Sequence, residues 1–134
     1  MIYVDASAFV AMLGREPRGE AMAYMLDGSD AFITSAMALW ETAIALVRLG
    51  HCSHEEADLI LQEAMTRSQI RVVDIGAVEA MAAVDAHRRF GKGRHPAQLN
   101  MGDCFAYAVA KSHKAAMLAV GDDFPLTDLK IVAY

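Results

Sequence analysis

In this 134-residue sequence, several acidic residues lie just after predicted strands, which is where α/β proteins bind their ligands. Asp5 directly follows the apolar stretch 2–4, which we expect to form a short buried strand. Asp122 and Asp123 follow a second such stretch at 116–120. Ligands of an open α/β sheet bind outside the carboxyl ends of its strands, so these three carboxylates are expected at one crevice. A simple helix-capping role for Asp5 stays open.

Two further acids belong to predicted helices. A helix is expected over 35–49. Glu41 lies on its apolar face, four residues after Met37 and three before Ile44. Burying a lone carboxylate costs several kcal/mol after relaxation, so we expect a cation to meet Glu41. Asp103 begins a helix expected over 101–113, where the helix dipole favours its ionised form.

A set of converging carboxylates is the kind of site that binds a hard divalent cation. Mg²⁺ and Mn²⁺ prefer oxygen ligands and usually keep several waters beside one or two protein carboxylates. Such an ion could activate water as a nucleophile and stabilise the charge that develops on a phosphate. Each acid taken singly could equally be a helix cap or a solvated charge.

The remaining pattern predicts strands that alternate with helices, and hence a mostly parallel sheet with helices on both faces. Five strands are expected, at 2–4, 31–34, 70–74, 116–120 and 131–133. Helices are expected to start at Ser7, near 18, at Ser35, after Ser53, at 77 and at 101. Their inward stripes are predicted to include Met37, Trp40, Ile44 and Val47 in one helix and Val78, Met81 and Val84 in another.

Composition limits the class of protein. A length of 134 residues with 55% hydrophobic content predicts one domain, 1–134, with one core. Twelve basic against seventeen acidic residues give a net charge of −5, which argues against nucleic-acid binding by bulk charge alone. Cys52 and Cys104 do not make a disulfide framework, and with no export signal or membrane-length apolar run we expect a soluble cytoplasmic protein with buried thiols.

Taken together, the motifs resemble the PIN-domain ribonuclease toxins of the VapC type. The resemblance rests on four segments that agree in order and spacing from end to end: Val4-Asp5-Ala6-Ser7-Ala8, Glu41-Thr42, Asn100-Met101-Gly102-Asp103-Cys104-Phe105-Ala106-Tyr107-Ala108, and Gly121-Asp122-Asp123-Phe124 with Thr127-Asp128. It implies a PIN fold and Mg²⁺- or Mn²⁺-dependent endonuclease cleavage of structured RNA such as tRNA or rRNA.

The resemblance also implies site residues and partners. Asp5, Glu41 and Asp103 match the metal-site acids of the family. The fourth acid is Asp122 or Asp123, and we favour Asp123 because it directly precedes a Phe. The implied partners, besides RNA, are a second copy of the chain and a VapB-type antitoxin whose tail inserts a basic side chain into the carboxylate pocket.

A basic segment precedes the Asp103 helix. The stretch 88–95 carries four positive charges, among them Arg89, Lys92 and Arg94. We expect a flexible loop in which these three side chains contact RNA phosphates, although a solvated helix end explains the same charges. Phe90 is more typical of a core residue than of a base platform.

Other readings remain open at this stage. A phosphatase could use Asp5 as a nucleophile, although such enzymes usually carry a second Asp where this chain has Ser7. A non-catalytic module could use the acidic crevice to bind a basic peptide. Ser7 is expected to cap its helix or to support the metal site, Thr127 to support a turn, and the histidines at 51 and 54 lack zinc-like partners.

Overall fold

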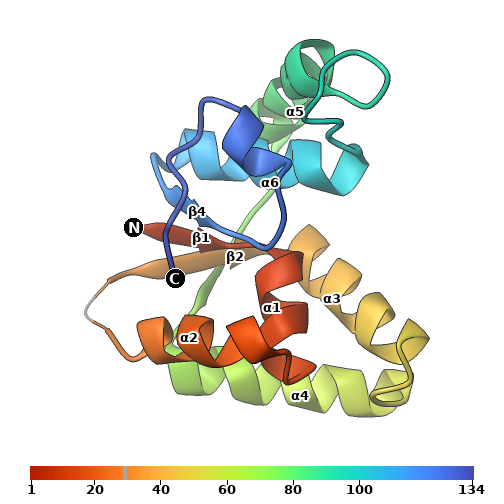
Figure 1. The fold of residues 1–134 in the computed structure, drawn as a ribbon, viewed down its shortest axis with the longest axis vertical. Coiled ribbons are helices and arrows are strands. Elements are labelled where there is room, and N and C mark those ends of the chain that lie inside the picture. The colour runs from red at the N-terminus through yellow and green to blue at the C-terminus, as the bar shows by residue number, and fades with distance from the viewer. Residues whose placement is uncertain (29) are drawn as a thin grey trace.

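The computed structural model describes residues 1–28 and 30–134, and it forms a parallel four-stranded sheet between two layers of helices (Figure 1). The strands are β1 (Ile2–Val4), β2 (Phe32–Ser35), β3 (Arg71–Val73) and β4 (Ala116–Leu118), in the order β3, β2, β1, β4. The helices are α1 (Ala6–Leu13), α2 (Pro17–Leu26), α3 (Ala36–Arg48), α4 (His54–Ser68), α5 (Ala77–Phe90) and α6 (Met101–Ser112), followed by the short 3₁₀ helix η1 (Phe124–Leu126).

Side chains of β1 alternate between two hydrophobic cores because successive residues of a strand point to opposite faces. Ile2 and Val4 pack with α1 and α2, and Tyr3 packs with α5 and α6. Figure 1 shows α1, α2 and α4 on one side of the sheet and α5 and α6 on the other. The predicted α/β architecture with both faces covered is confirmed, but the prediction of one core is wrong, because the sheet separates two.

The carboxyl ends of β1 and β2 are joined by side-chain hydrogen bonds as well as by the sheet. The hydroxyl of Thr34 donates to the carbonyl of Val4 at 2.8 Å, and the hydroxyls of Tyr3 and Ser35 lie 2.8 Å apart. Thr34 and Ser35 are fully buried. These bonds fix the end of β1, which precedes Asp5, relative to the end of β2, which precedes α3.

The prediction of a fifth strand at 131–133 is wrong. Ile131 forms one isolated parallel bridge with Met117, supported by a 2.8 Å bond from the Met117 amide to the Lys130 carbonyl and a 2.9 Å bond from the Val132 amide to the Met117 carbonyl. The pairing ends there, so this segment closes the β4 edge without extending the sheet.

Two of the predicted inward helix faces are also wrong. Trp40 is 60% exposed and Ile44 is exposed too, whereas the residues of α3 that are buried are Ala38, Thr42 and Leu46. On α5 the exposed residues are Val78, Met81 and Val84, and the buried ones are Ala83, Ala86 and Phe90. Ala38 of α3 and Ala83 of α5 face the core beside the larger Leu46 and Phe90, and such small residues let a helix approach its neighbour closely.

The first helix also begins differently from the prediction. Asp5, not Ser7, is the N-cap of α1, since its carboxylate accepts a hydrogen bond from the Ser7 amide. The predicted cap of α4 is confirmed by a 3.1 Å bond from the Glu56 amide to the Ser53 hydroxyl. Within the described ranges, no helix combines the length and apolar character needed to cross a bilayer.

Candidate functional site

Asp5 lies at the carboxyl end of β1, where the sheet gives way to α1. Its amide donates to the Leu118 carbonyl at 3.0 Å, which continues the pairing of β1 with β4. One carboxylate oxygen accepts from the Ser7 amide at 2.9 Å and from the Ser7 hydroxyl at 2.6 Å. The side chain is only 5% exposed, and this burial raises the pKa of Asp5 although the Ser7 hydrogen bonds lower it.

Ser7 connects Asp5 to the neighbouring strand end. While its hydroxyl donates to Asp5, it accepts a hydrogen bond from the Val120 amide at 2.9 Å. Val120 stands between β4 and the Gly121 turn that carries Asp122 and Asp123. The residue predicted to cap α1 therefore joins the carboxyl ends of β1 and β4, in the supporting position that the sequence also allowed.

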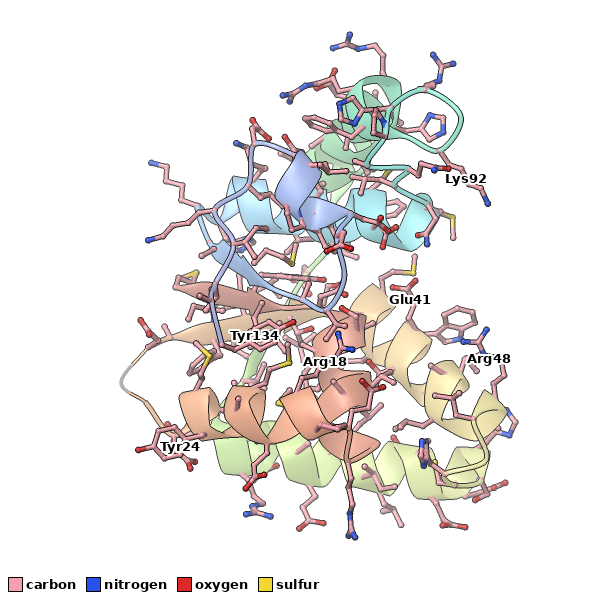
Figure 2. The ribbon with its side chains drawn as sticks, in the orientation of Figure 1. Arg18, Tyr24, Glu41, Arg48, Lys92 and Tyr134 are labelled. Atoms are coloured by element: carbon pink, nitrogen blue, oxygen red, sulfur yellow. The ribbon has the colours of Figure 1, made fainter. Side chains whose placement is uncertain are left out.

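Glu41 projects from α3 toward the first turn of α6. Figure 2 shows its carboxylate on the side of α3 that faces α6. A Cβ atom added at Gly102 would overlap the carboxylate of Glu41, so glycine at this position lets that group lie where it does. Burial, followed by the negative charges of Asp5 and Asp103, raises the pKa of Glu41 to about 7.

Asp103 is the third residue of α6 and forms a reciprocal cap with Asn100. The backbone amide of Asn100 donates to one carboxylate oxygen of Asp103 at 3.0 Å. The backbone amide of Asp103 donates to the side-chain oxygen of Asn100 at 2.9 Å. Burial, together with the charges of Asp5 and Asp123, raises the pKa of Asp103 to about 6 against the lowering effect of the Asn100 bond. The cap fixes this carboxylate at the start of α6.

Asp122 and Asp123 occupy an exposed turn after β4. Gly121 adopts a φ of +106°, which turns the chain out of the strand, and Asp123 is the N-cap residue of η1 without a capping bond from its side chain. Of the two acids, Asp123 is the one whose charge raises the pKa of Asp103. The structure thus brings Asp123 into the neighbourhood of the other acids.

The acids share one electrostatic environment but do not form a finished coordination shell. In residues 1–28 and 30–134, no three His, Cys, Asp or Glu side chains are close enough to hold an ion as they stand. The donor set nevertheless fits a hard divalent cation, because it consists of carboxylates that raise one another's pKa and gain from added positive charge.

Comparison with known proteins agrees with this geometry. The family model described as PIN domain matches residues 2–130. Ribonuclease VapC from Mycolicibacterium smegmatis is 40% identical over 130 residues, covering 96% of this chain and 98% of the relative. Ribonuclease VapC30 from Mycobacterium tuberculosis is 39% identical over 131 residues, covering 97% of each chain.

The chain belongs to the PIN-domain family, among the VapC ribonucleases. Solved structures agree on the fold of this PIN domain. The M. tuberculosis toxin VapC20, which its title describes as cleaving the sarcin-ricin loop, superposes with a TM-score of 0.77 at 22% identity, covering 98% of both chains. A toxin-antitoxin complex from Klebsiella pneumoniae superposes with a TM-score of 0.70 at 15% identity, covering all of this chain and 98% of the other.

The basic loop of this PIN domain is more ordered than the sequence suggests. Gly91 and Leu99 form a parallel bridge, the Lys92 amide donates to the Leu99 carbonyl at 3.0 Å, and the Arg94 amide donates to the Gly91 carbonyl at 3.0 Å. Phe90 is buried and stacks edge-on against His95, with ring centroids 5.2 Å apart, as expected of a core residue. The folded backbone leaves the side chains of Lys92 and Arg94 exposed.

Arg89 differs from its two basic neighbours in the loop. Its guanidinium donates to the Tyr107 hydroxyl at 3.1 Å and to Asp128 at 3.4 Å, and it lies 3.8 Å from Asp85. The donors that were predicted to meet phosphate are therefore engaged within the protein. Tyr107 and Lys111 were missed as site-related residues, although their spacing of four and eight residues after Asp103 on one helix face was a readable signal.

The remaining predictions concern single residues. Thr127 supports the turn as expected, since its hydroxyl donates to the Phe124 carbonyl at 2.7 Å and accepts from the Leu129 amide at 3.2 Å. Cys104 is buried, whereas Cys52 is only partly buried, contrary to expectation. The exposure of Trp40, beside Glu41, contradicts its predicted place in the core.

A second concavity lies away from the acids, between α1, α2 and α4. Its walls include Phe9, Met12 and Leu13 of α1, Tyr24 of α2 and Ile60 of α4, with Glu20, Glu63 and Arg67 at its polar margin. It is an apolar groove with charged edges. Its residues supply no acid to the Asp5 site.

Proposed function

We propose that this protein is a divalent-metal-dependent endoribonuclease, the toxin of a VapBC-type toxin-antitoxin pair, built as a single PIN domain over residues 1–134. The observation that carries the proposal is the approach of carboxylates from three elements: Glu41 of α3 lies against Gly102, directly before Asp103 of α6, and the charges of Asp103 and of Asp5 after β1 add to burial in raising the pKa of Glu41. The names of relatives that are 39 to 40% identical over almost the whole chain support ribonuclease activity.

Asp5, Glu41 and Asp103 would hold the ion, with Asp123 as the fourth acid and Asp122 as its alternative. Mg²⁺ or Mn²⁺ bound there would supply an activated water and stabilise the charge on phosphorus. Ser7 and Asn100 fix the carboxylates of Asp5 and Asp103 through hydrogen bonds. A phosphatase that uses Asp5 as its nucleophile is disfavoured, because such enzymes usually carry a second Asp two residues later and this chain has Ser7 there.

The substrate we infer is structured RNA. Lys92 and Arg94 project from the ordered loop that directly precedes α6, so they can hold phosphates beside the acids. A net charge of −5 means that such a local basic surface has to provide the attraction. We propose that the protein acts in the cytoplasm, where such RNA is found.

We also propose two protein partners. An antitoxin of the VapB type would neutralise the pocket by inserting a basic side chain among the acids, which a charge-assisted hydrogen bond would stabilise. A second copy of the chain would cover exposed apolar side chains of α5 and α3, among them Val78, Met81, Val84, Trp40 and Ile44.

The test of activity is RNA cleavage by the purified protein with Mg²⁺ or Mn²⁺. We expect discrete fragments with the wild type, and their loss both with EDTA and in Asp103→Asn, which keeps the side-chain size and replaces one carboxylate oxygen with an amide. Asp58→Asn on the exposed face of α4 serves as the matched control and is expected to cleave normally. Undiminished fragments with Asp103→Asn would contradict the proposal.

A further inference from the structure

Asp128 lies at the centre of a polar cluster that no step of the proposed reaction uses. Its Oδ1 atom accepts a hydrogen bond of 2.6 Å from the hydroxyl of Tyr107, and its Oδ2 atom accepts one of 3.2 Å from Lys111 and one of 3.4 Å from Arg89. We call Arg89, Tyr107, Lys111 and Asp128 the Asp128 cluster.

The cluster joins three elements that each carry part of the site. Arg89 is at the end of α5, directly before the loop of Lys92 and Arg94. Tyr107 and Lys111 belong to α6, the helix that carries Asp103. Asp128 follows η1, so it belongs to the segment that begins with Asp123.

Spacing along α6 relates the cluster to the acids. Asp103, Tyr107 and Lys111 are four residues apart in succession, which places them on one face of the helix at intervals of about 6 Å. Asp123 affects Asp103 at the first of these positions, and Asp128 contacts the second and third. Segment 123–128 therefore runs along that face, held near its start by the buried Phe124 and at its end by the bonds of Asp128 to α6.

The segment between the two ties has little freedom of its own. Phe124 is buried in the core, and the Thr127 amide and hydroxyl both donate to the Phe124 carbonyl, at 2.9 and 2.7 Å. The Leu126 amide donates to the Asp123 carbonyl at 3.2 Å. A displacement of Asp128 along α6 would therefore be transmitted to Asp123, five residues earlier.

We propose that Asp128 and Tyr107 are positioning residues that hold Asp123 beside Asp103, so that the Asp128 cluster sets the geometry of the fourth acid. This inference rests on the proposed function, because it concerns how the acids of that site are placed. Arg89, at the end of α5, donates to the same Asp128 carboxylate and so fixes the start of the basic loop relative to the acids. The three donors also hold the pKa of Asp128 at about 2, so the tie is intact at every pH at which RNA is handled.

The test compares Tyr107→Phe and Asp128→Asn with Asp85→Asn as the matched control. Tyr107→Phe removes one hydroxyl and keeps the buried ring, and Asp128→Asn removes the charge of an exposed side chain. Asp85→Asn also removes a carboxylate partner of Arg89, at 3.8 Å, but leaves segment 123–128 untouched. Thermal unfolding of all three variants establishes that each is folded.

Two readouts separate a positioning role from a general effect on stability. The first is amide hydrogen exchange in the metal-free protein, where we expect the amides of Leu126 and Thr127 to exchange about tenfold faster in Tyr107→Phe and Asp128→Asn, with β1 and α3 unchanged. The second is Mn²⁺ affinity measured by titration, which we expect to fall about tenfold, in the range seen when groups that orient metal ligands are removed. Asp85→Asn is expected to match the wild type in both.

Wild-type exchange at 126 and 127 together with wild-type Mn²⁺ affinity in both variants would overturn the inference, as would faster exchange spread evenly over the whole domain. The exchange experiment needs neither metal nor RNA. Its outcome is therefore separate from the proposed function, which fails if the wild-type protein cleaves no RNA with Mg²⁺ or Mn²⁺.

Discussion

Glu41 shows most directly how a single side chain reports on the site. It projects from α3 toward the first turn of α6, where burial, followed by the negative charges of Asp5 and Asp103, raises its pKa to about 7. The causes of this shift are burial and two acidic side chains, with no basic side chain among them. The cation that we expected beside Glu41 is therefore not a basic side chain that lowers its pKa. A bound divalent ion would fill that role.

The first prediction concerns the stability of the metal-free protein. Because the pKa of Glu41 rises from 4.5 to about 7 on folding, the folded state holds a proton that the unfolded state has lost in this range, and stability falls as pH rises from about 4.5 to 7. Glu41→Gln removes this penalty. We expect it to raise the free energy of unfolding at pH 7.5 by on the order of 1 kcal/mol, after allowance for solvent screening.

Chemical denaturation in EDTA at pH 4 and pH 7.5 measures this effect. The gain from Glu41→Gln should be absent at pH 4, where the wild-type carboxyl is already protonated. An equal gain at both pH values, or a loss of stability at pH 7.5, would contradict the placement of Glu41 among other acids.

The second prediction concerns Gly102. A Cβ atom there would overlap the Glu41 carboxylate, which is the flexible end of a side chain and can move aside. Gly102→Ala should therefore change the melting temperature little but reduce RNA cleavage at least tenfold by displacing a site acid. Adding Glu41→Asp, which shortens that side chain by one methylene, should recover part of the activity, and a double variant no better than the single one would argue against this contact.

Among the elements, the ordered loop 91–99 provides the third prediction. Replacing Lys92 and Arg94 by Gln removes two exposed positive charges without touching the loop's backbone bonds. We expect weaker RNA binding, most pronounced at low salt, and a slope of log affinity against log salt that is shallower by about 1 to 2. Mn²⁺ affinity should be unchanged, and an equal loss of metal binding would refute the division of roles between loop and acids.

Helix α5 provides the fourth prediction. Val78, Met81 and Val84 form an exposed apolar stripe three residues apart, which a second copy of the chain would cover. Val84→Glu should shift the protein from dimer to monomer in size-exclusion chromatography with light scattering. Leu59→Glu on exposed α4 is the matched control, and a wild type that is monomeric at micromolar concentration would contradict the dimer.

The ends of the helices could be predicted from the sequence, but the faces that two of them turn to the core could not. Ser53 marked a helix start correctly, and the helix expected over 35–49 was placed within one residue at each end, because caps are local chemistry. The inward faces of α3 and α5 were assigned wrongly because Trp40, Ile44, Met81 and Val84 were taken as core on hydrophobicity alone. Close packing of helices favours Ala38 and Ala83 at the contact, and a surface set aside for a partner has the same composition as a core.

At the scale of the whole molecule, the site follows from the topology of the parallel sheet. The carboxyl ends of β1 and β4 are adjacent, so the positions of Asp5 and Asp123 at one edge could be predicted from strand endings. The approach of Glu41 and Asp103 depends on the packing of α3 against α6 at Gly102, which no local pattern in the sequence encodes. The resemblance to VapC toxins supplied that part, and the Asp128 cluster was found only in three dimensions.

The most direct test of the central claim, that acids from separate elements form one cation site, is a crystal structure of the protein grown with Mn²⁺ and recorded at the manganese absorption edge. We predict an anomalous peak between the carboxylates of Asp5, Glu41 and Asp103, at about 2.1 to 2.3 Å from at least two of their oxygens. An absent peak at millimolar Mn²⁺, or one bound only to acids outside this set, would contradict the account.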